Sequence, residues 1–177
     1  MTAKIKLNAA SGGGSFSLQA PSSSSNNRVM TLPDTADGTL LTTTNPKTGN
    51  ILQVVSTTKT DTASTTNQSS FEDISGMSVT ITPSATSSKI LVMVDMRLST
   101  NENKNVAYRL MRGSTQIYMG DASGNITRAT GSIRLEGAAK AEMQTEGAIF
   151  LDSPSTTSAT TYKLQWSVEG SGGSATT

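Results

Sequence analysis

The sequence has 177 residues, no cysteine and no histidine, and its 14 basic and 13 acidic residues leave a net charge of +1. These absences exclude disulfides, thiolate nucleophiles, Ser-His-Asp triads and metal sites built on Cys or His. Hydrophobic residues make up 34% and charged residues 15% of the chain, whereas disordered chains combine low hydrophobicity with high charge. The apolar residues also gather in short alternating runs, so the composition predicts an all-β protein with long polar turns.

The spread of charge and of apolar residues also limits the partners. The basic residues form no stripe that could follow a phosphate backbone, so we expect no nucleic-acid partner. No apolar stretch approaches the roughly 18–20 residues that span a bilayer, so we expect no membrane insertion. Residues 1–7 lack the apolar centre of a signal peptide, which predicts assembly in the cytoplasm.

Residues 1–50 differ in character from the rest of the chain. Short alternating runs occur at residues 4–7, 15–19 and 28–32, separated by glycine-rich and Pro-Ser-Asn-rich turns. Each run is too short to bury a core, and an isolated two-stranded hairpin is marginal in water. We therefore expect an extended arm of short strands that gains its order from a partner, either other copies of the chain or the rest of a particle.

Residues 51–177 have the pattern of an antiparallel β-sandwich, of the jelly-roll type. The predicted strands are residues 51–55, 77–82, 89–98, 106–111, 116–119, 126–135, 147–152 and 162–168, the last of them closing the domain. The most apolar run, 89–98, is the predicted central strand. Its core-facing set is Ile90, Val92, Val94, Met96 and Leu98. Residues 138–143 have helix-favouring composition but are too few to predict a helix.

Two turns resemble each other. Residues 82–89 and 153–163 both begin with Pro-Ser after one residue and continue through a Ser/Thr run into a strand. They are either corresponding corners, where the chain crosses between the two sheets of a sandwich, or two ordinary Ser/Thr-rich loops.

Several of these passages resemble tail-fibre-like virion structural proteins of marine and cyanobacterial phages. The resemblance is carried by residues 4–15, 16–21, 32–41, 51–55, 81–92 and 151–154. It implies a homotrimeric appendage whose N-terminal part attaches to the particle and whose C-terminal β-domain faces the host surface. Similar domains continue through at least one more strand after the Trp166 region, but residues 170–177 read like the middle of a turn. Either the chain is cut short there or this version of the domain ends early.

Paired carboxylates leave one kind of enzyme open, a glycosidase of the tailspike type. The candidates are Glu72, Asp73, Asp95, Glu136, Glu142 and Glu146. Glu72 and Asp73 are adjacent and would leave opposite faces of a strand, and Asp95 is out of phase with the core set of its strand. Residues 121–125 resemble a calcium loop but lack its alternating carboxylates and distal Glu, which favours a plain β-turn. We therefore predict no enzyme, no cofactor, and no catalytic or metal-binding residue.

Three aromatic residues are candidates for a sugar-binding platform. Tyr108, Tyr118 and Trp166 could stack on carbohydrate, but each lies in an apolar run. We expect at least two of them to pack in the core.

The expected function is that of a virion structural protein, a tail fibre or fibre-like appendage used in host attachment. Its expected partners are two further copies of the chain, tail or capsid proteins bound through residues 1–50, and a host-surface glycan or protein. The alternatives are a capsid decoration or head-fibre protein, and a carbohydrate-degrading tailspike.

Overall fold

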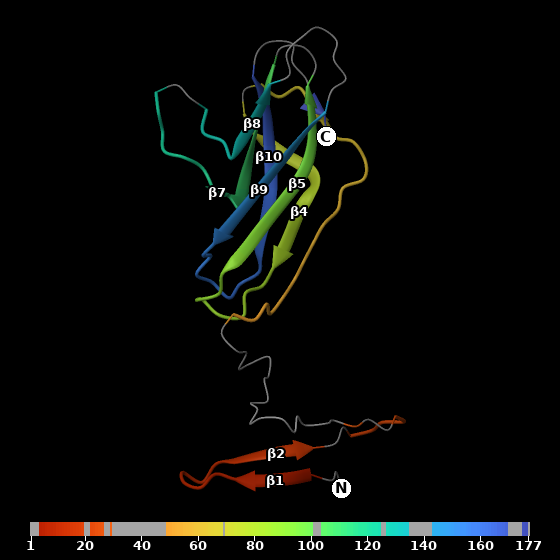
Figure 1. Ribbon diagram of the computed structural model, residues 1–177, viewed down its shortest axis with the longest axis vertical. Coiled ribbons are helices and arrows are strands. Elements are labelled where there is room, and N and C mark those ends of the chain that lie inside the picture. Colours follow the sequence, from red (N-terminus) through yellow and green to blue (C-terminus); the bar gives the residue numbers. More distant parts are fainter. Residues whose placement is uncertain are drawn as a thin grey trace. The chain divides into compact units, whose positions relative to one another are not determined.

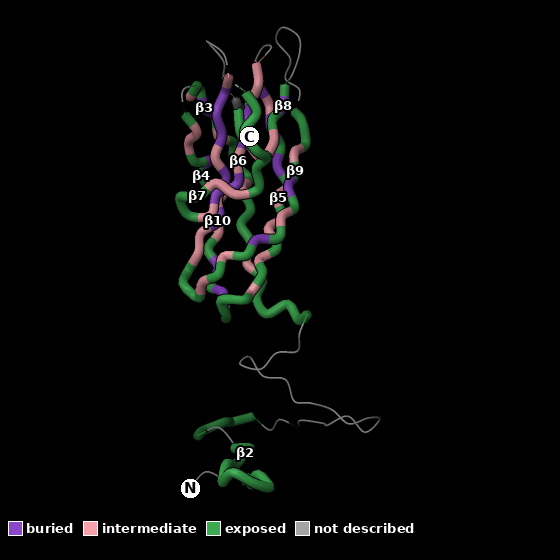
Figure 2. The backbone as a smooth tube through the Cα atoms, turned by 90° about the vertical axis from the view of Figure 1, so that its left-hand side faces the viewer, coloured by how far each residue is buried: buried purple, intermediate pink, exposed green. Residues whose placement is uncertain are grey.

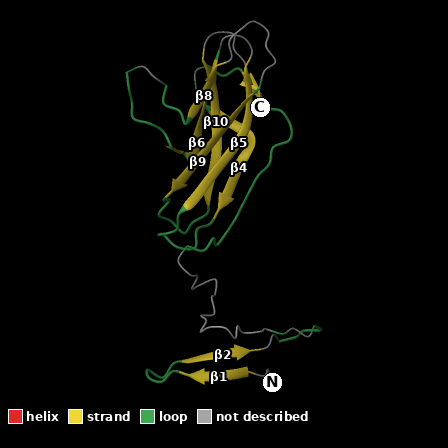
Figure 3. Ribbon diagram, viewed as in Figure 1, coloured by secondary structure: helices red, strands yellow, loops and turns green. Residues whose placement is uncertain are grey.

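The structure is a computed structural model, and it describes residues 4–19, 22–26, 29, 49–68, 70–100, 104–124, 127–134, 143–169 and 175–176. The chain divides into two compact units, Met1–Leu52 and Gln53–Thr177. The described residues form strands, turns and loops but no helix (Figure 3), which confirms the all-β prediction. No described segment is therefore an apolar helix long enough to cross a bilayer.

The first unit contains a β-hairpin of strands β1 (Lys4–Asn8) and β2 (Ser15–Gln19). The two strands pair antiparallel, with Ile5 opposite Leu18 and Asn8 opposite Ser15. The connecting turn passes through Gly12 and Gly13, which have φ of +83° and +69°, values that glycine adopts without steric cost. Of the run predicted at residues 28–32, only Val29 lies within the described residues.

The second unit is a sandwich of two antiparallel sheets (Figure 1). The strands of the first sheet are, in spatial order, β4 (Glu72–Ile81), β10 (Thr160–Glu169) and β6 (Asn105–Arg112), with β7 (Thr115–Ile117) and β8 (Gly131–Arg134) both paired along the far edge of β6. The strands of the second sheet are β3 (Ser64–Thr65), β11 (Ala175–Thr176), β5 (Ile90–Thr100) and β9 (Gln144–Asp152). This arrangement confirms the predicted sandwich.

The core lies between the sheets and draws side chains from both. Figure 2 marks the buried residues along the strands of the sandwich. Its members are Ile74, Met96, Leu98, Val106, Tyr108, Leu110, Ile133, Leu164, Trp166 and Val168. Trp166 and Tyr108 are the two largest fully enclosed side chains, and they stand opposite each other on β10 and β6. The two adjacent rings fill the centre of the first sheet's inner face.

The similar Pro-Ser turns are the corners of the sandwich, which decides between the two interpretations. Residues 82–89 carry the chain from β4 to β5 and residues 153–159 carry it from β9 to β10, so each passes from one sheet to the other. Ile81 is opposite Thr160, and Ile90 is opposite Asp152. Both corners therefore lie at the same end of the sandwich.

Two strand predictions were wrong. Residues 51–55 form no strand, and Ile51, Leu52 and Val54 are exposed. Strand-favouring residues form a strand only where a neighbouring strand pairs with their backbone. Strand β10 does not close the domain, because β11 follows it and pairs with β3 and β5.

Other strand bounds differ from the prediction. The predicted central strand, β5, pairs with β9 along most of its length but with β11 only at Ser99 and Thr100. Strand β4 begins at Glu72, well before the predicted 77, and β7 ends at Ile117, because Tyr118 has φ of +52°. The strand predicted at 126–135 forms over 131–134. Of the helix-favouring passage 138–143, only Met143 is described, outside any strand or helix.

Candidate functional site

The outer side of the β5–β9 pair carries four large apolar side chains, which we call the apolar face. Leu91 is opposite Leu151 and Met93 is opposite Ile149, so the four form two adjacent rows. Their exposed fractions are 57%, 59%, 70% and 64%, in that order. The sheet presents apolar side chains to solvent here, whereas the outer face of an antiparallel sheet is ordinarily polar.

Charged side chains lie at both ends of the apolar face. At one end the Lys89 Nζ donates a hydrogen bond to the Ser153 Oγ at 2.6 Å. At the other end the Arg97 Nη1 donates to the Asp95 Oδ1 at 2.6 Å, and the Asp95 side chain is 72% exposed. Asp95 therefore faces solvent, as its phase along the strand predicts.

The hairpin of the first unit has an uncovered apolar side as well, which we call the hairpin face. Ile5, Leu7 and Leu18 have exposed fractions of 64%, 58% and 44%. Ile5 and Leu18 are directly opposite each other, while Lys6 and Ser17 form the next pair along the ladder and so point to the other side. The hairpin thus separates apolar from polar side chains, and among the described residues none buries the apolar ones.

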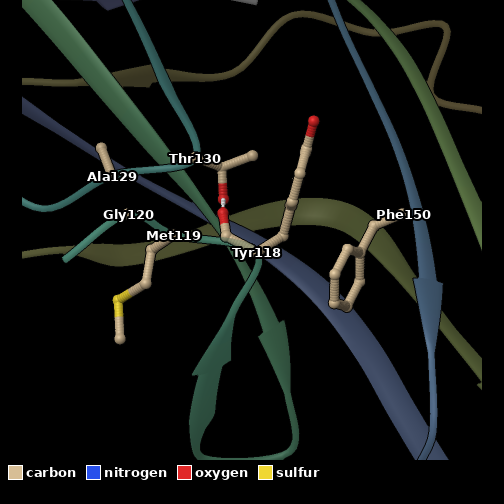
Figure 4. A pocket seen from close by; sticks show the side chains of 6 residues that line it. All are labelled: Tyr118, Met119, Gly120, Ala129, Thr130 and Phe150. Carbon is tan, nitrogen blue, oxygen red and sulfur yellow. Dashed lines mark hydrogen bonds between the residues drawn. The ribbon is translucent and has the colours of Figure 1, made fainter.

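A surface hollow lies where β7 ends (Figure 4). Its lining residues are Tyr118, Met119, Gly120, Ala129, Thr130 and Phe150. The Tyr118 ring stacks on the Phe150 ring with 5.0 Å between the ring centroids, and the Thr130 Oγ1 donates a hydrogen bond to the Tyr118 backbone oxygen at 3.1 Å. Figure 4 shows the two rings side by side, with the Met119 side chain pointing away from them.

The three candidate aromatic residues do not form one platform. Tyr108 and Trp166 are buried in the core, which confirms that at least two of the three pack there. The Tyr108 hydroxyl lies 3.3 Å from the Gly147 backbone oxygen, to which it donates. Burial, and then the nearby Glu146 carboxylate, raise the pKa of Tyr108 to about 12. Tyr118 is the member of the set that is exposed, at 42%.

The candidate carboxylates are dispersed, and several of them hold structural partners. Asp73 accepts hydrogen bonds from the Lys163 Nζ at 2.8 Å and the Gln165 Nε2 at 2.6 Å, and these bonds lower its pKa. Glu146 faces the Tyr108 hydroxyl and Glu72 faces the Asn67 amide, while Glu136 and Glu142 lie outside the described residues.

One described hollow brings two carboxylates together, Asp95 and Asp61. Each is ion-paired, Asp95 with Arg97 and Asp61 with Lys59 at 2.9 Å. The Lys59 hydrogen bond lowers the pKa of Asp61, whereas a glycosidase needs an acid whose pKa is raised. Asp61 therefore does not have the property that this chemistry requires of its acid.

A buried polar cluster joins the two sheets at their corner end. Asp152, at the end of β9, accepts hydrogen bonds from the Arg112 Nη1 at 2.8 and 3.0 Å and from the Tyr162 hydroxyl at 2.6 Å. Burial, and then the hydrogen bond to Asp152, raise the pKa of the Tyr162 hydroxyl, so it stays a donor at neutral pH. No buried side-chain nitrogen or oxygen of the described residues lacks a hydrogen-bond partner, which favours a structural role for the cluster.

Among the residues that the structure describes, no group of three or more acidic side chains could hold a metal ion. Asp121, in the loop that resembles a calcium site, is exposed, and Asn125 lies outside the described residues. Comparison with protein-family models, curated proteins and solved structures gives no match for this chain. The functional inference therefore depends on the two apolar surfaces and the Tyr118 hollow.

Proposed function

We propose that the protein is a non-enzymatic structural subunit of a virion appendage, a tail fibre in the first instance. In this role the arm holds the particle and the sandwich domain meets the host surface. The observation that carries the proposal is the hairpin face. Ile5, Leu7 and Leu18 are exposed on a two-stranded hairpin, and such a hairpin needs a partner for stability.

The arm would bury its hairpin face against tail or capsid proteins, or against the arms of other copies. Strand addition and packing of an apolar face are the two general ways in which an extended β-segment binds. The resemblance to tail fibres implies three copies, and we propose a homotrimer. A trimer gathered by its arms would present three domains at once, so that weak contacts with the host add up to firm attachment.

Native mass measured by light scattering tests the arm. We expect a trimer for the full chain, and loss of the trimer after removal of residues 1–50 or in Leu7→Lys, because the substitution places a charge on the hairpin face. Ser15→Lys is the matched control, since it adds the same charge to the polar side of the same hairpin, opposite the uncharged Asn8, and should leave the mass unchanged. A monomer in every form would contradict the fibre and favour the capsid decoration protein.

The Tyr118 hollow is the described surface best suited to a host glycan. Tyr118 is 42% exposed and held by Phe150, and a fixed aromatic ring can stack on a sugar. On a glycan array we expect Tyr118→Ala to weaken binding about tenfold, the equivalent of about 1.4 kcal/mol. Tyr118→Phe keeps the ring and should bind as the unchanged protein does. Equal binding by all three forms would contradict a glycan site here.

A further inference from the structure

The apolar face of β5–β9 has no cover among the described residues. Leu91, Met93, Ile149 and Leu151 each expose more than half of their surface, and they are contiguous because the ladder places them in adjacent rows. Contiguous exposed apolar side chains with charged residues at the rim mark interaction sites. The identity of the partner can be inferred from the charges at the two ends of the face.

The outward-facing residues of β5 have a self-complementary order. Lys89, just before the strand, is positive, Leu91 and Met93 are apolar, and Asp95 is negative. Arg97, the next residue on this side, lies beyond the apolar face and donates to one Asp95 oxygen, Oδ1. A rotation of 180° about an axis that crosses β5 between Leu91 and Met93 exchanges the two ends. It places Lys89 of one copy opposite Asp95 of a second copy, and Leu91 opposite Met93.

Strand β9 has the same symmetry without charges. The rotation that exchanges Leu91 and Met93 also exchanges Leu151 with Ile149, and Ser153 with Gly147. No charged residue of β9 would meet another at the ends of the face. A three-fold axis parallel to the strands would not pair opposite charges. It would bring the Lys89 side chains of all three copies to the same level along the axis.

We propose that two copies of this chain pack their apolar faces together, antiparallel, with Lys89 of each copy beside Asp95 of the other. The contact is isologous and forms a closed pair, with two sheets face to face as in a sandwich. It goes beyond the proposed function, because a trimer gathered by its arms can still pair its domains with those of a second trimer. Standard interfaces use about 20–30 residues on each side, so this smaller contact should depend on concentration.

The first test measures native mass by light scattering on the full chain, from roughly 1 μM to 1 mM, the range of weak affinities. We expect the mass to double across the series. Met93→Glu should hold the lower mass throughout, whereas Val54→Glu, at an exposed apolar residue outside the apolar face, should double like the unchanged protein. A constant mass for the unchanged protein would overturn the pair, and so would a threefold rise that persists in Leu7→Lys, where the arm trimer is lost.

The second test exchanges the charges. Lys89→Glu and Asp95→Lys each place like charges together at both ends of the face, so each variant alone should pair about tenfold more weakly. An equimolar mixture should recover the affinity, because the introduced glutamate of one variant then meets the introduced lysine of the other. A mixture that pairs no better than its components would refute the antiparallel contact. Loss of the arm trimer in Leu7→Lys is a separate event, so the two proposals fail independently.

Discussion

At the scale of single residues, the packing of a core tyrosine ring in the first sheet requires a glycine on the neighbouring strand. Gly131 on β8 is directly opposite Tyr108 on β6, and a Cβ atom at Gly131 would lie 2.6 Å from the Tyr108 ring. The ring has little freedom to move, because it is 2% exposed and its hydroxyl bonds the Gly147 backbone oxygen. The site therefore excludes any side chain larger than hydrogen.

Gly131→Ala should lower the free energy of unfolding by about 1–3 kcal/mol, the usual cost of overpacking a core. Gly120→Ala is the matched control, since a Cβ atom there meets nothing within 4 Å, and it should change stability by less than about 0.5 kcal/mol. Urea denaturation of both variants measures the difference. Equal stability of the two variants would show that Tyr108 moves aside freely.

From the sequence, the burial of some of these residues can be predicted, but their contacts with distant strands cannot. An apolar run around Tyr108 and Trp166 predicts burial, and both are buried. The same reasoning could not show that Tyr118 is exposed while the other two are buried. Its exposure follows from a backbone φ of +52° immediately after β7. A tyrosine gives no indication in the sequence that the backbone is left-handed there. Gly131 likewise gave no signal, since its close approach to a ring depends on the pairing of two distant strands.

At the scale of elements, strand β4 contains a bulge that explains its unexpected length. Ser78 is opposite Lys163 and Asp73 is opposite Gln165, so several residues of β4 face a single residue of β10. Gly76 lies within this bulge with φ of +82°. The bulge lets one strand continue through a break in alternation, which is why period-2 reasoning found only its second half.

Gly76→Ala should lower the free energy of unfolding by about 1–2 kcal/mol, the cost of a left-handed conformation for a residue with a Cβ atom. Steric overlap adds little, because the new Cβ would lie 3.8 Å from the nearest atom of the Lys59 side chain. Thermal unfolding compared with Gly120→Ala isolates the backbone effect. A stability equal to that of the control would mean that the bulge relaxes without strain.

The apolar face is the element-scale feature that sequence analysis missed. The alternation of residues 89–98 correctly assigns Met96 and Leu98 to the core, but it says nothing of Leu91 and Met93 on the other side. A strand that is apolar on both sides is ordinarily covered on both. The apolar residues on both sides were therefore visible in the sequence, but only the structure shows that no described residue covers this side.

At the scale of the whole molecule, composition and turn chemistry suffice for the class of fold. The all-β sandwich and its two Pro-Ser corners follow from local patterns, because a proline ends a strand and a Ser/Thr run favours a turn. Strands β3 and β11 could not be predicted, since each has two residues and exists only through pairing across the length of the domain. The change in the length of the alternating runs near residue 50 predicts an arm and a domain, whereas the compact units divide between Leu52 and Gln53.

The positions of the last two described strands have a consequence for the time course of folding. β10 lies between β4 and β6 in one sheet, and β11 lies between β3 and β5 in the other. Each sheet therefore lacks an interior strand until β10 and β11 have been synthesised, and until then no described strand pairs with β4. Such non-local pairing makes folding slow, in milliseconds to seconds. A nascent chain that stops before Thr160 would contain fragments of both sheets and could not close either of them.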